Sequence, residues 1–140
     1  MCIFCQIIAG DSPASFLHQD ADCVAFMNIR PIHPGEFMVI PRRHIDHFTD
    51  LPDDLACHIL RVAQRLGRNL LREMKPLRVG YVVHGFGVPH AHLNVVPLHD
   101  STDIVSARHV VPTDTGFAVS LAHLERPERS ELDRLARLLA

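Results

Sequence analysis

The stretch "VPHAHLNVVPLHD", residues 88–100, alternates polar and apolar side chains and sets the fold expected for the chain. Side chains two positions apart on a β-strand lie on the same face, with their Cα atoms roughly 6.6 Å apart. We therefore expect His90, His92 and Asn94 to project together from one face, while the apolar residues between them pack beneath a helix. Taken alone, two such histidines are more typical of a half-exposed strand than of a site, so other residues must decide.

Short apolar segments bounded by proline or glycine predict the strands. They are residues 23–28 ("CVAFMN"), 36–41 ("EFMVIP") and 79–84 ("VGYVVH"), the last pairing with residues 92–98 through a tight turn. Residues 100–126 show no firm periodicity, and we expect irregular structure there with one short strand near "FAVSL".

Two helices are expected where apolar residues recur every three or four positions. The main helix spans residues 52–74, and the acidic pair Asp53 and Asp54 suits the positive end of its dipole rather than catalysis. The second begins near Pro127 and has four residues on its buried side: Leu132, Leu135, Leu138 and Leu139. Because strands and helices do not alternate, we expect an α+β fold: an antiparallel sheet of about five strands, one long helix packed on it and a C-terminal helix.

Composition limits the class of protein. The chain has 140 residues, is 47% hydrophobic and carries a formal charge of −2, which suits one domain over residues 1–140 with one core. The 14 basic residues form no long run, so we expect no nucleic-acid partner, although a small anionic ligand remains possible. No window approaches the roughly 20 apolar residues of a membrane span, and the first basic residue is Arg30, so we expect a cytoplasmic protein without a membrane partner.

The cysteines point to reduced thiols rather than a disulfide framework. Cys2 and Cys5 have the spacing by which two thiolates reach one tetrahedral zinc, and His44 and His90 are candidates for the other two ligands. The alternative is a free or redox-active pair. Redox CxxC motifs normally follow a strand and open a helix, and no strand precedes residue 2, which favours metal. Two further cysteines lie in apolar patterns and are expected in the core: Cys23 and Cys57.

Three segments together carry a family resemblance: "CIFCQIIAGDSPA", "FMNIRPIHPGEFMVIPRRHI" and "VPHAHLNVVP". In this order, over residues 2–98, the chain resembles the histidine triad family of nucleotide hydrolases and transferases, which leaves residues 99–140 as a C-terminal extension. The family motif is His-φ-His-φ-His-φ-φ, and Asn94 stands where the third histidine is expected. Members of the transferase branch have glutamine there, one methylene longer than asparagine.

The resemblance implies that His92 attacks the α-phosphorus of a nucleotide and forms a nucleotidyl-histidine intermediate, which water or an acceptor then releases. Asn94 can donate a hydrogen bond to a phosphoryl oxygen but cannot act as a general acid. In zinc-containing members a CxxC pair and two histidines hold a structural zinc, and here Cys2, Cys5, His44 and His90 fill those places. A homodimer, with the sheets joined edge to edge and the main helices at the interface, is also implied.

The resemblance further implies a nucleotide pocket. Apolar residues enclose the base, Asn28 binds ribose hydroxyls, and backbone amides around Gly85 and Gly87 bind the phosphates. The residues matching the base site are Ile3, Phe4, Ile7, Phe26, Met27 and Ile29. The phosphate loop departs from the family, because Phe86 and Gly87 replace a glutamine and a hydroxyl residue. The alternative function is therefore a zinc-stabilised nucleotide-binding protein with little turnover.

Most other histidines are expected on the surface. These are His18, His47, His58, His109 and His123. Three more flank the expected site and are left open: His33, His84 and His99.

Overall fold

The computed structural model describes residues 2–104 and 107–140. The helices are α1 (Ile3–Ala9), α2 (Asp53–Met74) and α3 (Arg129–Leu139). The strands are β1 (Phe16–Gln19), β2 (Cys23–Met27), β3 (Phe37–Pro41), β4 (Arg78–Val82), β5 (Leu93–Leu98), β6 (Val110–Thr113) and β7 (Gly116–Val119). Single-turn 3₁₀ helices span Phe48–Asp50 and Ala107–His109.

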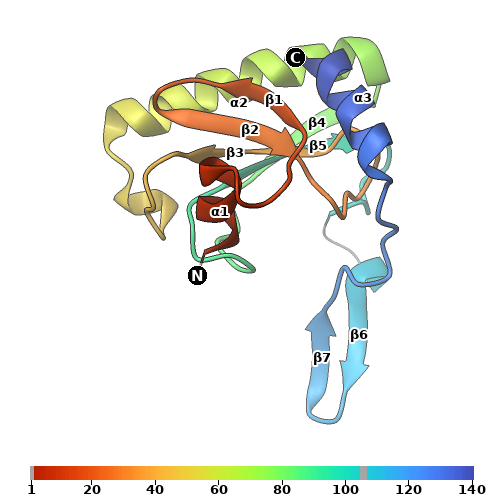
Figure 1. Ribbon diagram of the computed structural model, residues 1–140. Coiled ribbons are helices and arrows are strands. Elements are labelled where there is room, and N and C mark those ends of the chain that lie inside the picture. Colours follow the sequence, from red (N-terminus) through yellow and green to blue (C-terminus); the bar gives the residue numbers. More distant parts are fainter. Residues whose placement is uncertain (1, 105–106) are drawn as a thin grey trace.

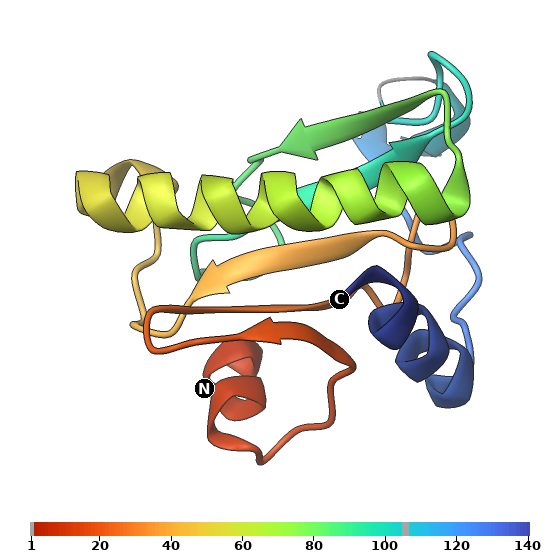
Figure 2. The ribbon, with the colours of Figure 1, turned by 90° about the horizontal axis from the view of Figure 1, so that it is seen from above.

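An antiparallel five-stranded sheet with the order β1-β2-β3-β5-β4 organises the chain, as the α+β prediction required. The long helix α2 packs along one face of the sheet, α3 lies beside it near β1 and β2, and α1 covers part of the opposite face (Figures 1 and 2). Strands β6 and β7 form a separate hairpin that projects away from the sheet (Figure 1).

The core follows from the two-residue period of the strands. On β2, Cys23, Ala25 and Met27 pack toward α2 and α3, whereas Val24 and Phe26 pack toward α1. On α2 the buried side chains recur at the spacing of one helical face: Ile59, Val62, Ala63, Leu66 and Leu70. Because both faces of the central strands are covered, β2 and β3 are buried along their whole length.

The first part of the motif does not lie in a strand as predicted. Strand β5 begins at Leu93, and both His90 and His92 precede it. The backbone before β5 bonds outside the sheet: the Ala91 amide donates to the Ile45 carbonyl at 2.7 Å, and the Pro41 carbonyl at the end of β3 accepts the His90 ring, Nε2–O 2.9 Å.

The remaining boundaries agree with the prediction except at the ends of the chain. Helix α1 and strands β1 and β6 were not predicted, while β7 lies at the expected "FAVSL" segment. In α3, Leu132, Leu135 and Leu139 are buried, but Leu138 is exposed and Ala136 takes its place in the core. The prediction for Leu138 was wrong because Leu132, Leu135, Ala136 and Leu139 form one stripe, and Leu138 lies roughly 60° round the helix from the nearest of them.

The C-terminal extension is anchored by a buried carboxylate. Asp103 is 1% exposed, and its side chain pairs with His33 Nε2 at 2.9 Å and with Arg108 Nη1 at 3.0 Å. It also accepts the backbone amides of His99 and Asp100 at 2.8 and 2.9 Å. Burial by itself raises the pKa of Asp103, but these hydrogen bonds outweigh it and hold the pKa below its usual range. The extension is therefore tied to the loop that leads into β3.

No helix formed by residues 2–104 and 107–140 combines the length and the apolar composition needed to cross a membrane.

Candidate functional site

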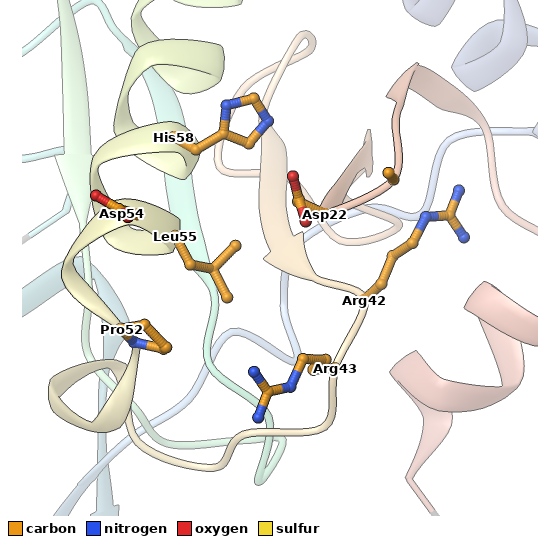
Figure 3. A pocket seen from close by; sticks show the side chains of 8 residues that line it. Asp22, Arg42, Arg43, Pro52, Asp54, Leu55 and His58 are labelled. Atoms are coloured by element: carbon orange, nitrogen blue, oxygen red, sulfur yellow. The ribbon is translucent and has the colours of Figure 1, made fainter.

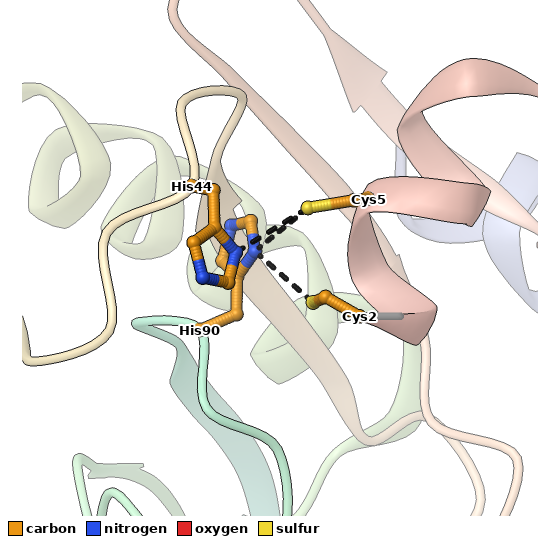
Figure 4. Close-up of side chains that lie close together, drawn as sticks. All are labelled: Cys2, Cys5, His44 and His90. Carbon is orange, nitrogen blue, oxygen red and sulfur yellow. Dashed lines mark hydrogen bonds between the residues drawn. The ribbon is translucent and has the colours of Figure 1, made fainter.

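Four predicted metal ligands meet beside the first turn of α1 (Figure 4). Cys2 and Cys5 come from the start of the chain, His44 from the loop after β3, and His90 from the segment before β5. Cys2 Sγ lies 3.5 Å from His90 Nδ1, and Cys5 Sγ lies 3.4 Å from His44 Nδ1 and 3.8 Å from His90 Nδ1. Cys2 and Cys5 are free thiols.

These separations suit a tetrahedral metal ion. With Zn–S near 2.3 Å and Zn–N near 2.0–2.1 Å, a tetrahedron has S···N edges of about 3.6 Å. The three S···N separations lie on either side of this value. Two thiolates also neutralise a dication, so the four residues fit zinc in geometry and in charge.

His90 is held in the tautomer that a metal needs. The ring is fully buried, and its Nε2–H donates to the Pro41 carbonyl, which leaves the Nδ1 lone pair facing the two sulfurs. Burial lowers the pKa of His90, which favours the neutral imidazole. A second hydrogen bond of this kind orients histidine ligands in many metal sites.

His92 lies next along the chain and is also fixed by the backbone. It is 8% exposed, and its Nδ1–H donates to the His90 carbonyl at 2.7 Å. Its Nε2 is therefore the unprotonated, nucleophilic nitrogen of the neutral ring. The Phe4 ring on α1 meets His90 and His92 edge-on, with centroids 5.7 and 5.6 Å apart. This packing joins the metal-ligand set to the predicted nucleophile.

Asn94 lies on the same face of the sheet as α1. Its neighbours Leu93 and Val95 pack in the core beneath α2, and its cross-strand partner on β3 is Met38, which packs beneath α1. Directly paired residues share a face, so Asn94 points away from α2. In the part of the chain that the structure describes, the buried Asn94 Oδ1 has no hydrogen-bond partner.

An apolar cavity of about 430 Å³ opens on this face. All seven residues predicted for the base and ribose line it: Ile3, Phe4, Ile7, Phe26, Met27, Asn28 and Ile29. Met38 and Val88 complete the apolar wall toward the motif. Helix α1, β2 and the segment before the motif thus converge on one cavity, although they are up to 85 residues apart in sequence.

One polar residue of this cavity, Arg129 at the start of α3, was not predicted from the sequence. Its Nη1 donates to Ser15 Oγ at 3.0 Å, and Ser15 Oγ donates to Asp133 Oδ1 at 2.5 Å. In sequence Arg129 is one arginine among several on an exposed-looking helix, so only the packing of α3 against β1 could identify it.

Asn28 is held at the rim of the cavity by a buried acid. Its Nδ2 donates to Glu36 Oε1 at 2.8 Å, and its Oδ1 accepts the Arg30 amide at 2.9 Å. The other carboxylate oxygen, Glu36 Oε2, accepts the Ile32 amide at 2.6 Å. Burial raises the pKa of Glu36, and the two hydrogen bonds oppose this only in part. The Asn28 amide keeps one N–H and one lone pair for a ligand.

The loop before the motif is open to solvent. Gly85 and Gly87 have φ of 81° and 98°, a left-handed backbone that other residues rarely adopt. Phe86 between them is 77% exposed and tilts against His84, with ring centroids 5.0 Å apart. The loop therefore offers backbone amides but no side-chain phosphate donor at residues 86 and 87.

For the remaining histidines and cysteines, some predictions of burial or exposure are confirmed and others are wrong. His47 and His123 are exposed, as expected, and His18 and His58 are partly exposed. His109 is buried, because its Nε2 donates to the Asp103 carbonyl at 2.8 Å, so its surface prediction was wrong. Cys23 is buried as predicted.

Cys57 is exposed, so its core prediction was wrong: on α2 it falls between the buried positions. Of the histidines left open, His33 and His99 belong to the Asp103 anchor and stack edge-on at 4.8 Å.

The family follows from comparison with known proteins. A model of the HIT domain matches residues 9–101, more than half of the chain. The chain belongs to the HIT domain family. An uncharacterized HIT-like protein of Methanocaldococcus jannaschii is 32% identical over 108 residues, 71% of this chain and 81% of the relative. An adenosine 5'-monophosphoramidase of Schizosaccharomyces pombe is 32% identical over 98 residues, 69% of this chain and 73% of the relative.

Solved HIT structures share this architecture. The crystal structure of a zinc-bound histidine triad family protein from Mycobacterium smegmatis matches with a TM-score of 0.75 at 27% identity. The match covers 99% of this HIT chain and 91% of that protein.

Proposed function

We propose that this HIT protein is a nucleotide hydrolase or nucleotidyl transferase that acts at the α-phosphorus through a nucleotidyl-histidine intermediate on His92. The observation that carries the proposal is the hydrogen bond from His92 Nδ1–H to the His90 carbonyl at 2.7 Å, which leaves Nε2 unprotonated in a ring that packs edge-on against Phe4, a residue of the cavity wall. Relatives named adenosine 5'-monophosphoramidase support a nucleotide substrate.

In the first step Nε2 of His92 forms a bond to the α-phosphorus as the bond to the leaving group breaks. In the second step the oxygen of water or of an acceptor attacks the same phosphorus, the P–N bond breaks, and the attacking oxygen loses its proton. The Nδ1–H···O bond to His90 stabilises the positive charge that the ring carries in the intermediate.

The cavity residues account for binding. Aromatic and aliphatic side chains enclose the base between α1 and β2, and the free N–H and lone pair of Asn28 bind the ribose hydroxyls. Amides around Gly85 and Gly87 bind the phosphates, without help from side chains at residues 86 and 87.

Asn94 takes the third position of the motif and donates its amide to a phosphoryl oxygen. Rotation of the amide by 180° exchanges Oδ1 and Nδ2, so the buried position without a protein partner can present an N–H. An amide has no proton to give to a departing amine, so substrates whose leaving groups depart as anions are favoured.

We propose zinc as the metal of the Cys2, Cys5, His44 and His90 set, with a structural role. All four positions of a tetrahedron are filled by protein, which leaves none for water or substrate. The zinc-bound relative from Mycobacterium smegmatis supports this assignment. We also propose that residues 1–140 form one domain and that the protein is cytoplasmic.

The zinc assignment predicts that Cys5→Ser lowers the metal content of the purified protein by one zinc per chain and reduces its thermal stability, because a tetrahedral ligand is lost. Metal analysis by mass spectrometry measures the content. The control is Cys57→Ser, which changes an exposed cysteine of α2 and should leave the zinc in place. Equal zinc content in both variants would contradict the assignment.

The His92 and Asn94 roles predict opposite effects of two substitutions on turnover. His92→Ala should abolish release of product from adenosine phosphoramidates and dinucleoside polyphosphates, whereas the exposed control His47→Ala should not. Asn94→His should raise phosphoramidate turnover relative to polyphosphate turnover by tenfold or more, since general acid catalysis is worth about 10²–10⁴ in rate.

Activity that survives His92→Ala, or a substrate ratio unchanged by Asn94→His in a folded variant, would refute these roles. Nucleotide binding without turnover of either substrate would favour the alternative, a zinc-stabilised nucleotide-binding protein.

Arg129 is proposed to contact the bound nucleoside. Arg129→Ala should raise KM about 3- to 10-fold with little change in kcat, the effect of one lost hydrogen bond in ground state and transition state alike. Arg137→Ala on the exposed side of the same helix is the control. Steady-state kinetics with a matched thermal unfolding curve separates binding from folding, and an unchanged KM would remove Arg129 from the binding site.

The homodimer remains a proposal supported by exposed apolar side chains. They include Leu60 and Leu71 on α2, and Tyr81 on the edge strand β4. Sedimentation at micromolar concentration should give the mass of a dimer. Leu71→Glu should shift it toward monomer through a buried charge, and Leu121→Glu outside these elements should not. A monomeric wild-type protein would overturn the proposal.

A further inference from the structure

A second cluster of metal-ligating side chains lies where the β1–β2 turn meets α2. Asp20 Oδ2 is 2.7 Å from His18 Nε2 and 2.7 Å from His58 Nε2, and Cys23 Sγ is 3.7 Å from the same oxygen. The four ligand atoms all lie within 4.8 Å of one another. His58 reaches from α2 toward the turn that carries Asp22 (Figure 3).

The backbone fixes the direction of the carboxylate. Asp20 Oδ1 accepts the amides of Asp22 and Cys23, both at 2.8 Å, so Oδ2 is turned toward the two imidazoles and the thiol. Burial alone raises the pKa of Asp20, but hydrogen bonds from the Cys23 amide, His18 and His58 outweigh it and keep the carboxylate ionised. Hydrogen bonds of this outer kind hold ligands ready in metal sites.

We propose that His18, Asp20, Cys23 and His58 form a second metal site, which binds a borderline transition-metal dication such as zinc and links the β1–β2 hairpin to α2. The proposal does not depend on the nucleotide chemistry of His92.

The donor set fits such an ion in chemistry and charge. One sulfur, two imidazole nitrogens and one carboxylate oxygen are ligands that zinc takes in tetrahedral sites. The Cys23 thiolate and the Asp20 carboxylate together neutralise the dication, so the metal and its ligands would carry no net charge in this partly buried site. The four side chains range from the fully buried Cys23 to the partly exposed His58, which leaves a path from solvent.

The distances between the ligand atoms of the cluster match a tetrahedral zinc site after a small movement of the two imidazoles. A tetrahedral site has S···O edges of about 3.6 Å and N···O edges of about 3.3 Å. The S···O separation is 3.7 Å, and the two N···O separations must widen from 2.7 Å. Both imidazoles are partly exposed and can withdraw by this amount.

Cys23 gives the cluster a feature that an ordinary His–Asp–His contact lacks. Burial, with the charge of Asp20 beside it, raises the pKa of Cys23 to about 12. A bound dication would displace the thiol proton, and the thiolate would take its place in the ligand set.

Arg65 opposes metal binding at His18 through a hydrogen bond. Its Nη2 lies 3.1 Å from His18 Nδ1 and donates to it, which leaves the proton of this ring on Nε2. A metal at Nε2 needs that proton on Nδ1, where it would face the guanidinium. Because Arg65 is exposed it can turn away, at the expense of its hydrogen bond, and the second site should be weaker than the first.

A cavity of about 290 Å³ beside the cluster provides an approach for the ion. His58, Asp22 and Asp54 line it together with Arg42 and Arg43, and Asp22 lies on the same side as Arg42 (Figure 3).

The test uses cobalt(II) as an absorbing substitute for zinc, added to the full-length protein after removal of metal by a chelator. The wild-type chain should bind two equivalents, the second more weakly. His58→Ala should bind one, while the matched control His47→Ala, an exposed histidine outside the cluster, should bind two. A wild type that binds one equivalent, or His58→Ala that keeps two, overturns the proposal.

Two further variants identify the ligands. In the Cys2→Ser, Cys5→Ser double variant, a sulfur-to-cobalt charge-transfer band should persist and should disappear on adding His58→Ala, but not on adding Cys57→Ser. Arg65→Ala should tighten the second binding step about 3- to 10-fold, the worth of one hydrogen bond. If Cys57→Ser removed the charge-transfer band, the second metal would be bound by other residues. The same conclusion would follow if Arg65→Ala left the affinity for the second metal unchanged. If the double variant does not fold, the equivalents counted for His58→Ala decide alone.

Discussion

The candidate site depends on how one buried ring is bonded, that of His90. Its Nε2–H reaches the Pro41 carbonyl at the end of β3, its Nδ1 faces the thiols of Cys2 and Cys5, and its backbone carbonyl accepts the Nδ1–H of His92. One residue therefore fixes the end of the central strand, the place of the N-terminal segment and the tautomer of the proposed nucleophile. A substitution there would disturb all three together, because each bond leaves a buried polar group without a partner when it is lost.

Helix α1 shows what local sequence could not predict. It has only seven residues, begins after Cys2 without a side-chain cap and carries no acidic residue in its first turn. A helix of this length is not stable by itself, so its form comes from tertiary contacts. Phe4 meets Phe26 edge-on at 5.4 Å and Ile7 joins the same apolar group. The CxxC spacing was visible in sequence, and the helix that presents it was not.

The sheet and α2 were predictable because their periods are long and unambiguous. The seven residues proposed for the base and ribose, which line one cavity, came from the family resemblance rather than from periodicity. The errors fall where burial is set by a distant partner. His109 is buried by the Asp103 carbonyl, and Cys57 is left in solvent by the rotation of α2. Arg129 reaches the cavity only because α3 packs against β1, a contact between segments more than a hundred residues apart. The extension beyond the family match thus completes both the core and the pocket wall.

Asn94 stands where the third histidine of the histidine triad motif is expected. Leaving a buried polar group without a partner costs about 1–3 kcal/mol, and Asn94 Oδ1 has none among residues 2–104 and 107–140. The neighbours of Asn94 across the sheet are Met38 on β3 and Val82 on β4. Under the proposed function, a rotated Asn94 amide presents an N–H to a phosphoryl oxygen, and this hydrogen bond would contribute to the free energy of binding. If His92 acts as proposed, an amide at residue 94 has no proton to give, so the leaving group would have to depart without general acid catalysis.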